Sequence, residues 1–223
     1  MNLKYFFMLV FSALLITSCA DKAKDDSKET QNAATASKND AQKSTDATTA
    51  AKKDAVHIEN VTFIKSFVEA RNSYDAEKLR AITTEDYQEV FKNDFVEVNS
   101  QKEFLSNLEW AEELSAKTTI KEVISANDTT VVAIEKTTNY IDEALKRTPR
   151  NFKTTYFIND GKIVKQNFEN APGDKFDQKA DDLLYGDFER FCEVRKIPFS
   201  WAPTKEEGKI LRKALEQYAN RQE

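Results

Sequence analysis

The residue types that carry nucleophilic or metal chemistry are scarce in this chain. His57 is the sole histidine, and Cys19 and Cys192 are the only cysteines. A Ser-His-Asp triad and a His/Cys metal site therefore both lack parts, and we expect neither a metal nor a cofactor. Cys192 stands between Phe191 and Glu193 in a helical pattern, which favours a small buried hydrophobe over a reactive thiol.

Cys19 follows a segment shaped like a secretion signal. Lys4 gives a short positive start, and residues 5–16 form an apolar stretch too short for a stable membrane span. The stretch closes on Ile16-Thr17-Ser18-Cys19, which resembles the lipobox of bacterial lipoproteins. The resemblance implies cleavage before Cys19 and lipidation of that cysteine, which would anchor the protein to a membrane. An ordinary signal peptide with an incidental cysteine is the alternative.

Residues 20–55 consist almost entirely of Ala, Lys, Asp, Ser, Thr, Asn and Gln. Such a segment cannot bury enough apolar surface to offset its ordering entropy, so we expect a disordered tether. Its lysines and acids interleave, which argues against a polybasic membrane-binding patch. Because Ala20 rather than an aspartate follows Cys19, we expect the outer membrane of a bacterial cell envelope, on either its periplasmic or its surface face.

The rest of the chain suits one domain with an extension. It is rich in Phe and Tyr and poor in Gly, and the whole chain has a formal net charge of −5. A mildly acidic chain without a basic stripe does not suit nucleic acid, so we expect no such partner. We therefore divide the chain into a signal peptide (1–18), a lipidated cysteine with its tether (19–55), a folded domain (56–172) and a helical extension (173–223).

Apolar residues recur at helical spacing in the first half of the domain. The pattern predicts a first helix from about Glu59 to Asn72. Asp75 is a good N-cap for a second, short helix. Residues 83–91 then form an extended segment or a further turn. The capping box Ser100-Gln101-Lys102-Glu103 predicts the start of a third helix.

β-branched residues dominate from Thr118 onward. They predict two strands around the turn Asn127-Asp128, the second running as far as Ile141, with residues 142–149 as a connection. Residues 152–164 then read as a hairpin with a turn at Asn159-Asp160-Gly161. Helices followed by a strand meander indicate an α+β domain: a curved antiparallel sheet wrapped around the N-terminal helices, as a cone-shaped barrel.

The C-terminal extension is again helical in its pattern. A second capping box, Thr204-Lys205-Glu206-Glu207, opens a final helix with Ile210, Leu211, Leu215 and Tyr218 as its apolar stripe. Such a stripe serves either the core or a dimer contact.

Four segments carry a resemblance to a known family. They are Phe63–Ala70, Asn72–Leu79, Thr84–Tyr87 and Tyr156–Val164. Their order and spacing resemble the nuclear transport factor 2-like superfamily, and within it the SnoaL-like proteins, over about residues 58–170. The resemblance implies a cone with a pocket at its open end. Relatives use that pocket for isomerisation, dehydration, cyclisation or ligand capture, and others serve as docking modules, so the fold alone fixes no function.

The acids of the best-known chemistry in this superfamily are missing from their expected places. Ketosteroid isomerases combine a carboxylate base with a Tyr and a protonated Asp that hold an oxyanion. The resemblance places Thr154 where that Asp would stand and Phe91 where the base would stand, with Glu89 two residues earlier. We therefore expect a non-catalytic site.

Alternation along the hairpin predicts an inward face that is apolar apart from a hydroxyl and a phenol. This face suits capture of a small apolar ligand, and filling of the cone as core is the alternative. With two further aromatic residues, the candidate ligand-binding residues are Trp110, Tyr140, Phe152, Thr154, Tyr156 and Ile158.

Three functions remain open from the sequence. The preferred one is a membrane-anchored, non-catalytic binding or protein-interaction domain of the bacterial cell envelope. The second is a SnoaL-like isomerase or dehydratase that uses displaced acids, for instance Glu89 or Glu135. The third is a homodimer or envelope-assembly part, with the helices of residues 174–223 as its partner surface.

Overall fold

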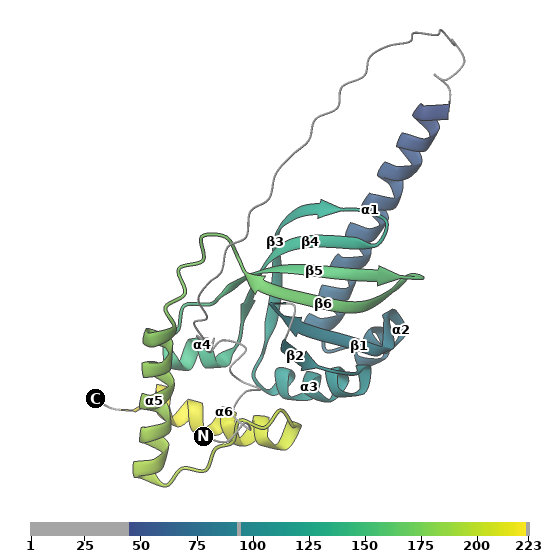
Figure 1. The fold of residues 1–223 in the computed structure, drawn as a ribbon. Helices are drawn as coiled ribbons and strands as arrows, with labels where there is room; N and C mark the ends of the chain where they lie inside the picture. The colour runs from purple at the N-terminus through teal and green to yellow at the C-terminus, as the bar shows by residue number, and fades with distance from the viewer. Residues whose placement is uncertain (1–44, 93–94, 222–223) are drawn as a thin grey trace, which may run out of the picture.

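The computed structural model describes residues 45–92 and 95–221, with side chains from residue 57 onward. Within this part of the chain, helices precede and follow a sheet (Figure 1). The helices are α1 (Thr45–Asn72), α2 (Ala76–Ile82), α3 (Gln101–Glu113), α4 (Tyr140–Leu145), α5 (Gln178–Arg195) and α6 (Lys205–Ala219). The strands are β1 (Thr83–Phe91), β2 (Phe95–Val98), β3 (Lys117–Ala126), β4 (Thr130–Thr138), β5 (Asn151–Asn159) and β6 (Lys162–Asn170).

The six strands form one sheet in the order β2-β1-β6-β5-β4-β3, which does not close on itself. The α+β class predicted from the sequence is confirmed. The sheet is mixed rather than purely antiparallel, because β1 runs parallel to β6 whereas the other neighbours are antiparallel. Tight turns fix the antiparallel direction of strands that are adjacent in sequence. No local turn joins β1 to β6, so the sequence pattern does not reveal their direction.

The predicted helix starts are confirmed at three caps. The side chains of Asp75, Ser100 and Thr204 accept hydrogen bonds from backbone N–H groups three residues later, at 2.9, 3.2 and 3.3 Å. Each cap satisfies a donor that the first helical turn leaves unpaired. Helix α1 begins at Thr45, within the stretch assigned to the tether, because alanine and lysine have high helix propensities.

Residues 139–145 differ from the sequence prediction. Strand β4 ends at Thr138, and α4 follows where a longer strand and a connection were expected. Asn139 accepts a hydrogen bond from the N–H of Asp142 at 3.1 Å, and the Asp142 carboxylate accepts one from the N–H of Asn139 at 3.0 Å. This reciprocal capping box stabilises a helix too short to show an apolar period.

Helix α1 runs along one face of the sheet (Figure 1), and its apolar residues pack into the first buried cluster. Phe67 lies edge-on to Tyr156 of β5, with ring centroids 5.9 Å apart, and both side chains are buried. Burial of an aromatic side chain of this size contributes about 1.5–3 kcal/mol. Ile64 and Leu79 complete this cluster from the two N-terminal helices.

A second buried cluster joins the C-terminal extension to the domain. Helices α4, α5 and α6 gather at one end of the sheet (Figure 1). Leu211, Leu215 and Tyr218, members of the stripe predicted on the last helix, are buried together with Leu114 and Ile141. Cys192 is buried in the same cluster with a free thiol. These three residues therefore serve the core of the molecule, whereas Ile210, the fourth residue of the predicted stripe, is 37% exposed.

The membrane-anchor prediction concerns Cys19, which lies outside the described residues. Among residues 45–92 and 95–221, no helix is long and apolar enough to cross a membrane.

Candidate functional site

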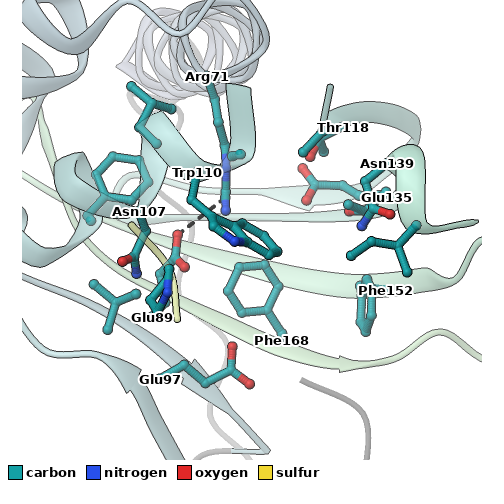
Figure 2. A pocket seen from close by; sticks show the side chains of 18 of the residues that line it. Arg71, Glu89, Glu97, Asn107, Trp110, Thr118, Glu135, Asn139, Phe152 and Phe168 are labelled. Carbon is teal, nitrogen blue, oxygen red and sulfur yellow. Dashed lines mark ion pairs between the residues drawn. The ribbon is translucent and has the colours of Figure 1, made fainter. Parts of the chain in front are cut away.

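A cavity of about 260 Å³ lies between the sheet, α3 and the C-terminal extension. Polar groups reach it from five elements: Arg71 of α1, Glu89 of β1, Glu97 of β2, Trp110 of α3 and Glu135 of β4. In Figure 2 the Trp110 ring lies between Arg71 and Phe168, with Glu89 to one side of it and Glu135 to the other. The cavity is thus walled by both carboxyl groups and aromatic rings.

The predicted inward face of β5 is confirmed, but its residues divide between the cavity and the core. Phe152 and Trp110 line the cavity. Thr154 and Tyr156 are fully buried behind Glu135, and Ile158 packs in the α1 cluster.

Tyr140 stands apart from these candidates. It lines a separate surface depression, where the guanidinium of Arg212 lies 3.4 Å above its ring.

Glu135 is almost completely buried, and both of its carboxyl oxygens accept hydrogen bonds. Oε2 accepts one from Thr154 Oγ1 at 2.8 Å, and Oε1 accepts one from the Tyr156 hydroxyl. Burial raises the pKa of the Glu135 carboxyl, and the two donors oppose that rise without cancelling it. The hydroxyl and phenol expected to meet a ligand are therefore already engaged by this acid.

Glu89 belongs to a network around the end of α1. Arg71 Nη1 lies 3.3 Å from Glu89 Oε1 and donates to Gln166 Oε1 at 3.2 Å. The Tyr87 hydroxyl lies 2.5 Å from Gln166 Oε1 and 3.0 Å from Glu89 Oε1. Burial alone would lower the pKa of Arg71, but nearby carboxylates, foremost Glu89, raise it above its ordinary value. Arg71 therefore stays charged beside the cavity.

Glu97 differs from the other two glutamates of the cavity in its lack of bonded partners within the described chain. Its half-buried carboxyl has no hydrogen bond or ion pair to any residue that the structure describes, and it lines the cavity. Burial, with the charge of Glu89 as a second cause, raises the pKa of Glu97 to about 8. A carboxyl that titrates near neutral pH can both donate and accept a proton under physiological conditions.

Trp110 supplies an unused donor. Its indole Nε1–H is buried and has no hydrogen-bond partner among the described residues. Phe152 and Phe168 meet edge to face, with centroids 6.3 Å apart, and extend the aromatic wall. A buried N–H without a partner costs free energy.

The C-terminal extension closes one side of the cavity through Tyr185 and Pro203. Arg147 holds this part in place. Its Nε and Nη2 donate to the two carboxylate oxygens of Asp181 at 2.6 and 3.1 Å, and its Nη1 donates to Asp142 at 3.1 Å. Nothing in the helical pattern of the extension indicated a contribution to the pocket.

One signal in the sequence could have located Glu135. Val131, Ala133 and Glu135 alternate on β4, so the glutamate shares the inward face of its two apolar neighbours. Glu97 sits on a strand of four residues, too short for such a pattern.

The three cavity glutamates form no metal centre, because no cluster of three or more His, Cys, Asp or Glu residues in the described ranges could hold a metal ion.

No protein-family model matches the sequence, and no curated protein matches it significantly. Solved structures are similar in part. An NTF2-like protein of unknown function from Cytophaga hutchinsonii is 11% identical, covering 49% of this chain and 88% of its own, with a TM-score of 0.39. A protein assigned as a SnoaL-like polyketide cyclase, from Jannaschia sp. CCS1, is 13% identical, covering 51% and 85%, with a TM-score of 0.42.

An LEH-like epoxide hydrolase from M. tuberculosis is 12% identical, covering 62% of this chain and 98% of its own, with a TM-score of 0.46. NTF2-like and SnoaL-like proteins are thus among the structures that this chain is similar to, as the sequence resemblance predicted. These similarities concern the fold and carry no conclusion about function.

Proposed function

We propose that this protein binds a small molecule in the cone cavity. The observation that carries the proposal is the convergence of the Glu97 carboxyl and the rings of Trp110, Phe152 and Phe168 on one cavity. Ligand pockets in proteins usually measure about 300–1,000 Å³, so a cavity of about 260 Å³ suits a small ligand. With polar groups on its wall, we expect a ligand that is apolar in its body and carries one or two hydrogen-bonding groups.

Mass spectrometry of the full chain, purified in detergent, tests this function. We expect a co-purified or added small compound to bind wild-type protein, and binding to weaken when Trp110→Leu removes the indole ring from the cavity wall. Glu85→Gln is the matched control, because Glu85 is exposed on β1 and does not line the cavity. Failure of wild-type protein to bind any member of a broad fragment panel would contradict the proposal.

We further propose that the binding domain is held in the bacterial cell envelope by lipid on Cys19. The lipobox-like Ile16-Thr17-Ser18-Cys19 supports this anchor. Metabolic labelling with a palmitate analogue is expected to mark wild-type protein and not Cys19→Ser. Equal labelling of both proteins would refute the anchor.

Acid–base catalysis is a second candidate, favoured by Glu97. The expectation of a non-catalytic site rested on acids missing from two places, and other acids occupy the cavity instead. Glu97 moves a proton on a carbon beside a carbonyl, while the Arg71 guanidinium stabilises the oxyanion that forms. This is chemistry of the isomerase or dehydratase kind.

Deuterium exchange tests the catalytic candidate. Wild-type protein in D₂O should speed exchange of the methyl protons of acetophenone, followed by NMR, whereas Glu97→Gln should not. Equal exchange by both proteins would remove Glu97 from the chemistry and leave the non-catalytic function.

Homodimerisation remains a hypothesis from the sequence. The buried residues of the α6 stripe are covered by α3, α4 and α5, so a dimer would need a different surface. Light scattering of full chain and of a chain lacking residues 174–223 tests it: an unchanged dimer after deletion would rule out the extension as partner surface.

A further inference from the structure

We infer that the C-terminal extension is part of the ligand site, and that Gly208 of α6 is a positioning residue that sets where Trp110 stands and hence which ligand sizes the cavity accepts. The inference rests on the proposed binding function of the same cavity. It goes beyond that function by assigning size selection to a residue that does not line the cavity.

The contact between α6 and α3 is the first observation. A Cβ atom added to Gly208 would lie 3.1 Å from Glu113 Cβ and 3.2 Å from Trp110 Cδ1. Both distances are shorter than ordinary van der Waals contact, so a Cβ at this position would require Trp110 or Glu113 to move by a few tenths of an ångström. The contacted Cδ1 is bonded to Nε1, the buried donor that lacks a partner among described residues.

Glycine is unfavourable in the interior of a helix, where its flexibility must be frozen. Gly208 has no left-handed backbone angle that would require glycine. The close approach to Trp110 and Glu113 therefore gives the physical reason for glycine at this place.

The rest of the extension reaches the same space. Tyr185 lies one helical turn after Asp181, whose carboxylate is held by Arg147, and the Arg147 guanidinium lies 4.8 Å from the centre of the Tyr185 ring. Pro203, at the entrance to α6, lines the cavity as well. The C-terminal extension thus provides both the lining residues Tyr185 and Pro203 and the Gly208 contact with Trp110. The buried ion pair of Arg147 with Asp181 fixes this extension to the domain.

The chain provides a matched pair of glycines for the test. Gly186 lies in α5, and a Cβ added there would meet nothing within 4 Å. Gly208→Ala and Gly186→Ala both replace a helical glycine, so both receive a similar gain from helix propensity. They differ in the contact with Trp110. Gly208→Leu and Gly186→Leu repeat the comparison with a larger side chain, which should displace Trp110 further at position 208 only.

Indole N–H signals in ¹⁵N NMR report the position of Trp110 directly. The chain has two tryptophans, and Trp201 Nε1 donates to Glu189 at 3.0 Å, which makes its signal an internal reference for folding. Trp201→Phe assigns the two signals. We expect Gly208→Ala to shift the Trp110 signal, because the ring must give way by a few tenths of an ångström, and Gly186→Ala to leave it in place.

Ligand size is probed with toluene and naphthalene on the full chain in detergent. We expect the naphthalene-to-toluene affinity ratio to fall roughly threefold in Gly208→Ala and roughly tenfold in Gly208→Leu, because a displaced Trp110 narrows the cavity. The ratio should stay unchanged in both Gly186 variants. If the leucine variant loses the Trp201 signal and does not fold, the alanine pair decides the question.

Two results would overturn the inference. One is a Trp110 signal that responds equally to Gly208→Ala and Gly186→Ala. The other is an unchanged affinity ratio in the Gly208 variants. If wild-type protein binds neither probe nor any fragment, the proposed binding function fails and the size-setting role with it, while the Trp110 signal still decides whether Gly208 positions the ring.

Discussion

The phenolic hydroxyl of Tyr156 donates to Oε1 of Glu135, across the pairing of β5 with β4. Thr154 donates to the second oxygen of the same carboxyl at 2.8 Å. The two donors hold a buried acid at the cavity wall without a cation bonded to it in the described residues. The result is a polar patch inside a face that the sequence presented as largely apolar.

Removing either donor should destabilise the fold. In Tyr156→Phe and Thr154→Val, one oxygen of buried Glu135 loses its partner, which costs about 1–3 kcal/mol each. Urea denaturation measures the change in the free energy of unfolding. A change below about 0.5 kcal/mol in both variants would show that the carboxyl does not depend on these bonds.

Glu97 should make stability fall as pH rises. The carboxyl titrates near 4.3 in an unfolded chain and at about 8 in the folded protein, so the unfolded state loses its proton first. Between these values the unfolded state binds fewer protons, and the free energy of unfolding decreases with pH. The free energy of unfolding of Glu97→Gln should equal that of wild type near pH 4 and exceed it at pH 8 to 9, so that it depends less on pH. Urea denaturation at each pH measures this free energy.

The control for that profile is Glu85→Gln, which removes an exposed carboxyl from β1. It should leave the difference between pH 4 and pH 9 unchanged. A Glu97→Gln profile parallel to that of wild type would show that the folded protein does not hold Glu97 protonated.

Arg71 should be needed to keep Glu89 buried. Arg71→Gln leaves the Glu89 carboxylate without its cation, and we expect a loss of about 2 kcal/mol in thermal denaturation, since the guanidinium is partly exposed. Arg190→Gln removes an arginine from an exposed pair with Asp187 and should change stability by less than about 0.5 kcal/mol. Equal effects of the two substitutions would contradict a special role for the Arg71 pair.

The link between Arg147 and Asp181 should govern opening of the extension. Asp181→Asn breaks a buried, two-pronged ion pair, and we expect about 2–4 kcal/mol less protection of α5 amides from hydrogen exchange. Asp182→Asn alters the adjacent, exposed aspartate and should have little effect. Faster hydrogen exchange confined to α5 and α6 would show that the Arg147–Asp181 pair holds the extension on the domain. A uniform loss of amide protection over the whole molecule would contradict this role.

The parts of the fold that could be predicted are those governed by local patterns. The hairpin at 152–164, its inward alternation and the helix starts at Asp75, Ser100 and Thr204 all follow from neighbours in sequence. The parallel pairing of β1 with β6 could not be predicted, because it joins segments far apart in the chain.

The site was less predictable than the fold. Phe152 and Trp110 were found, whereas Arg71 and Glu97 were not, since one ends a long helix and the other lies in a short strand. Glu135 was considered as a displaced acid, but its pairing with Tyr156 depends on the register of β4 against β5. The contribution of Tyr185 depends on packing between distant helices, which no local pattern contains.

The most direct test of ligand binding in the cone is a ¹⁵N titration of the two indole N–H groups with small aromatic carbonyl compounds such as acetophenone. Trp110 lines the proposed site and its Nε1–H has no partner in the described chain, whereas Trp201 Nε1 donates to Glu189. Binding in the cavity predicts a saturable shift of the Trp110 signal alone, weakened in Glu97→Gln. Signals that both stay fixed at saturating compound, or that shift together without saturation, would contradict a ligand site in the cone.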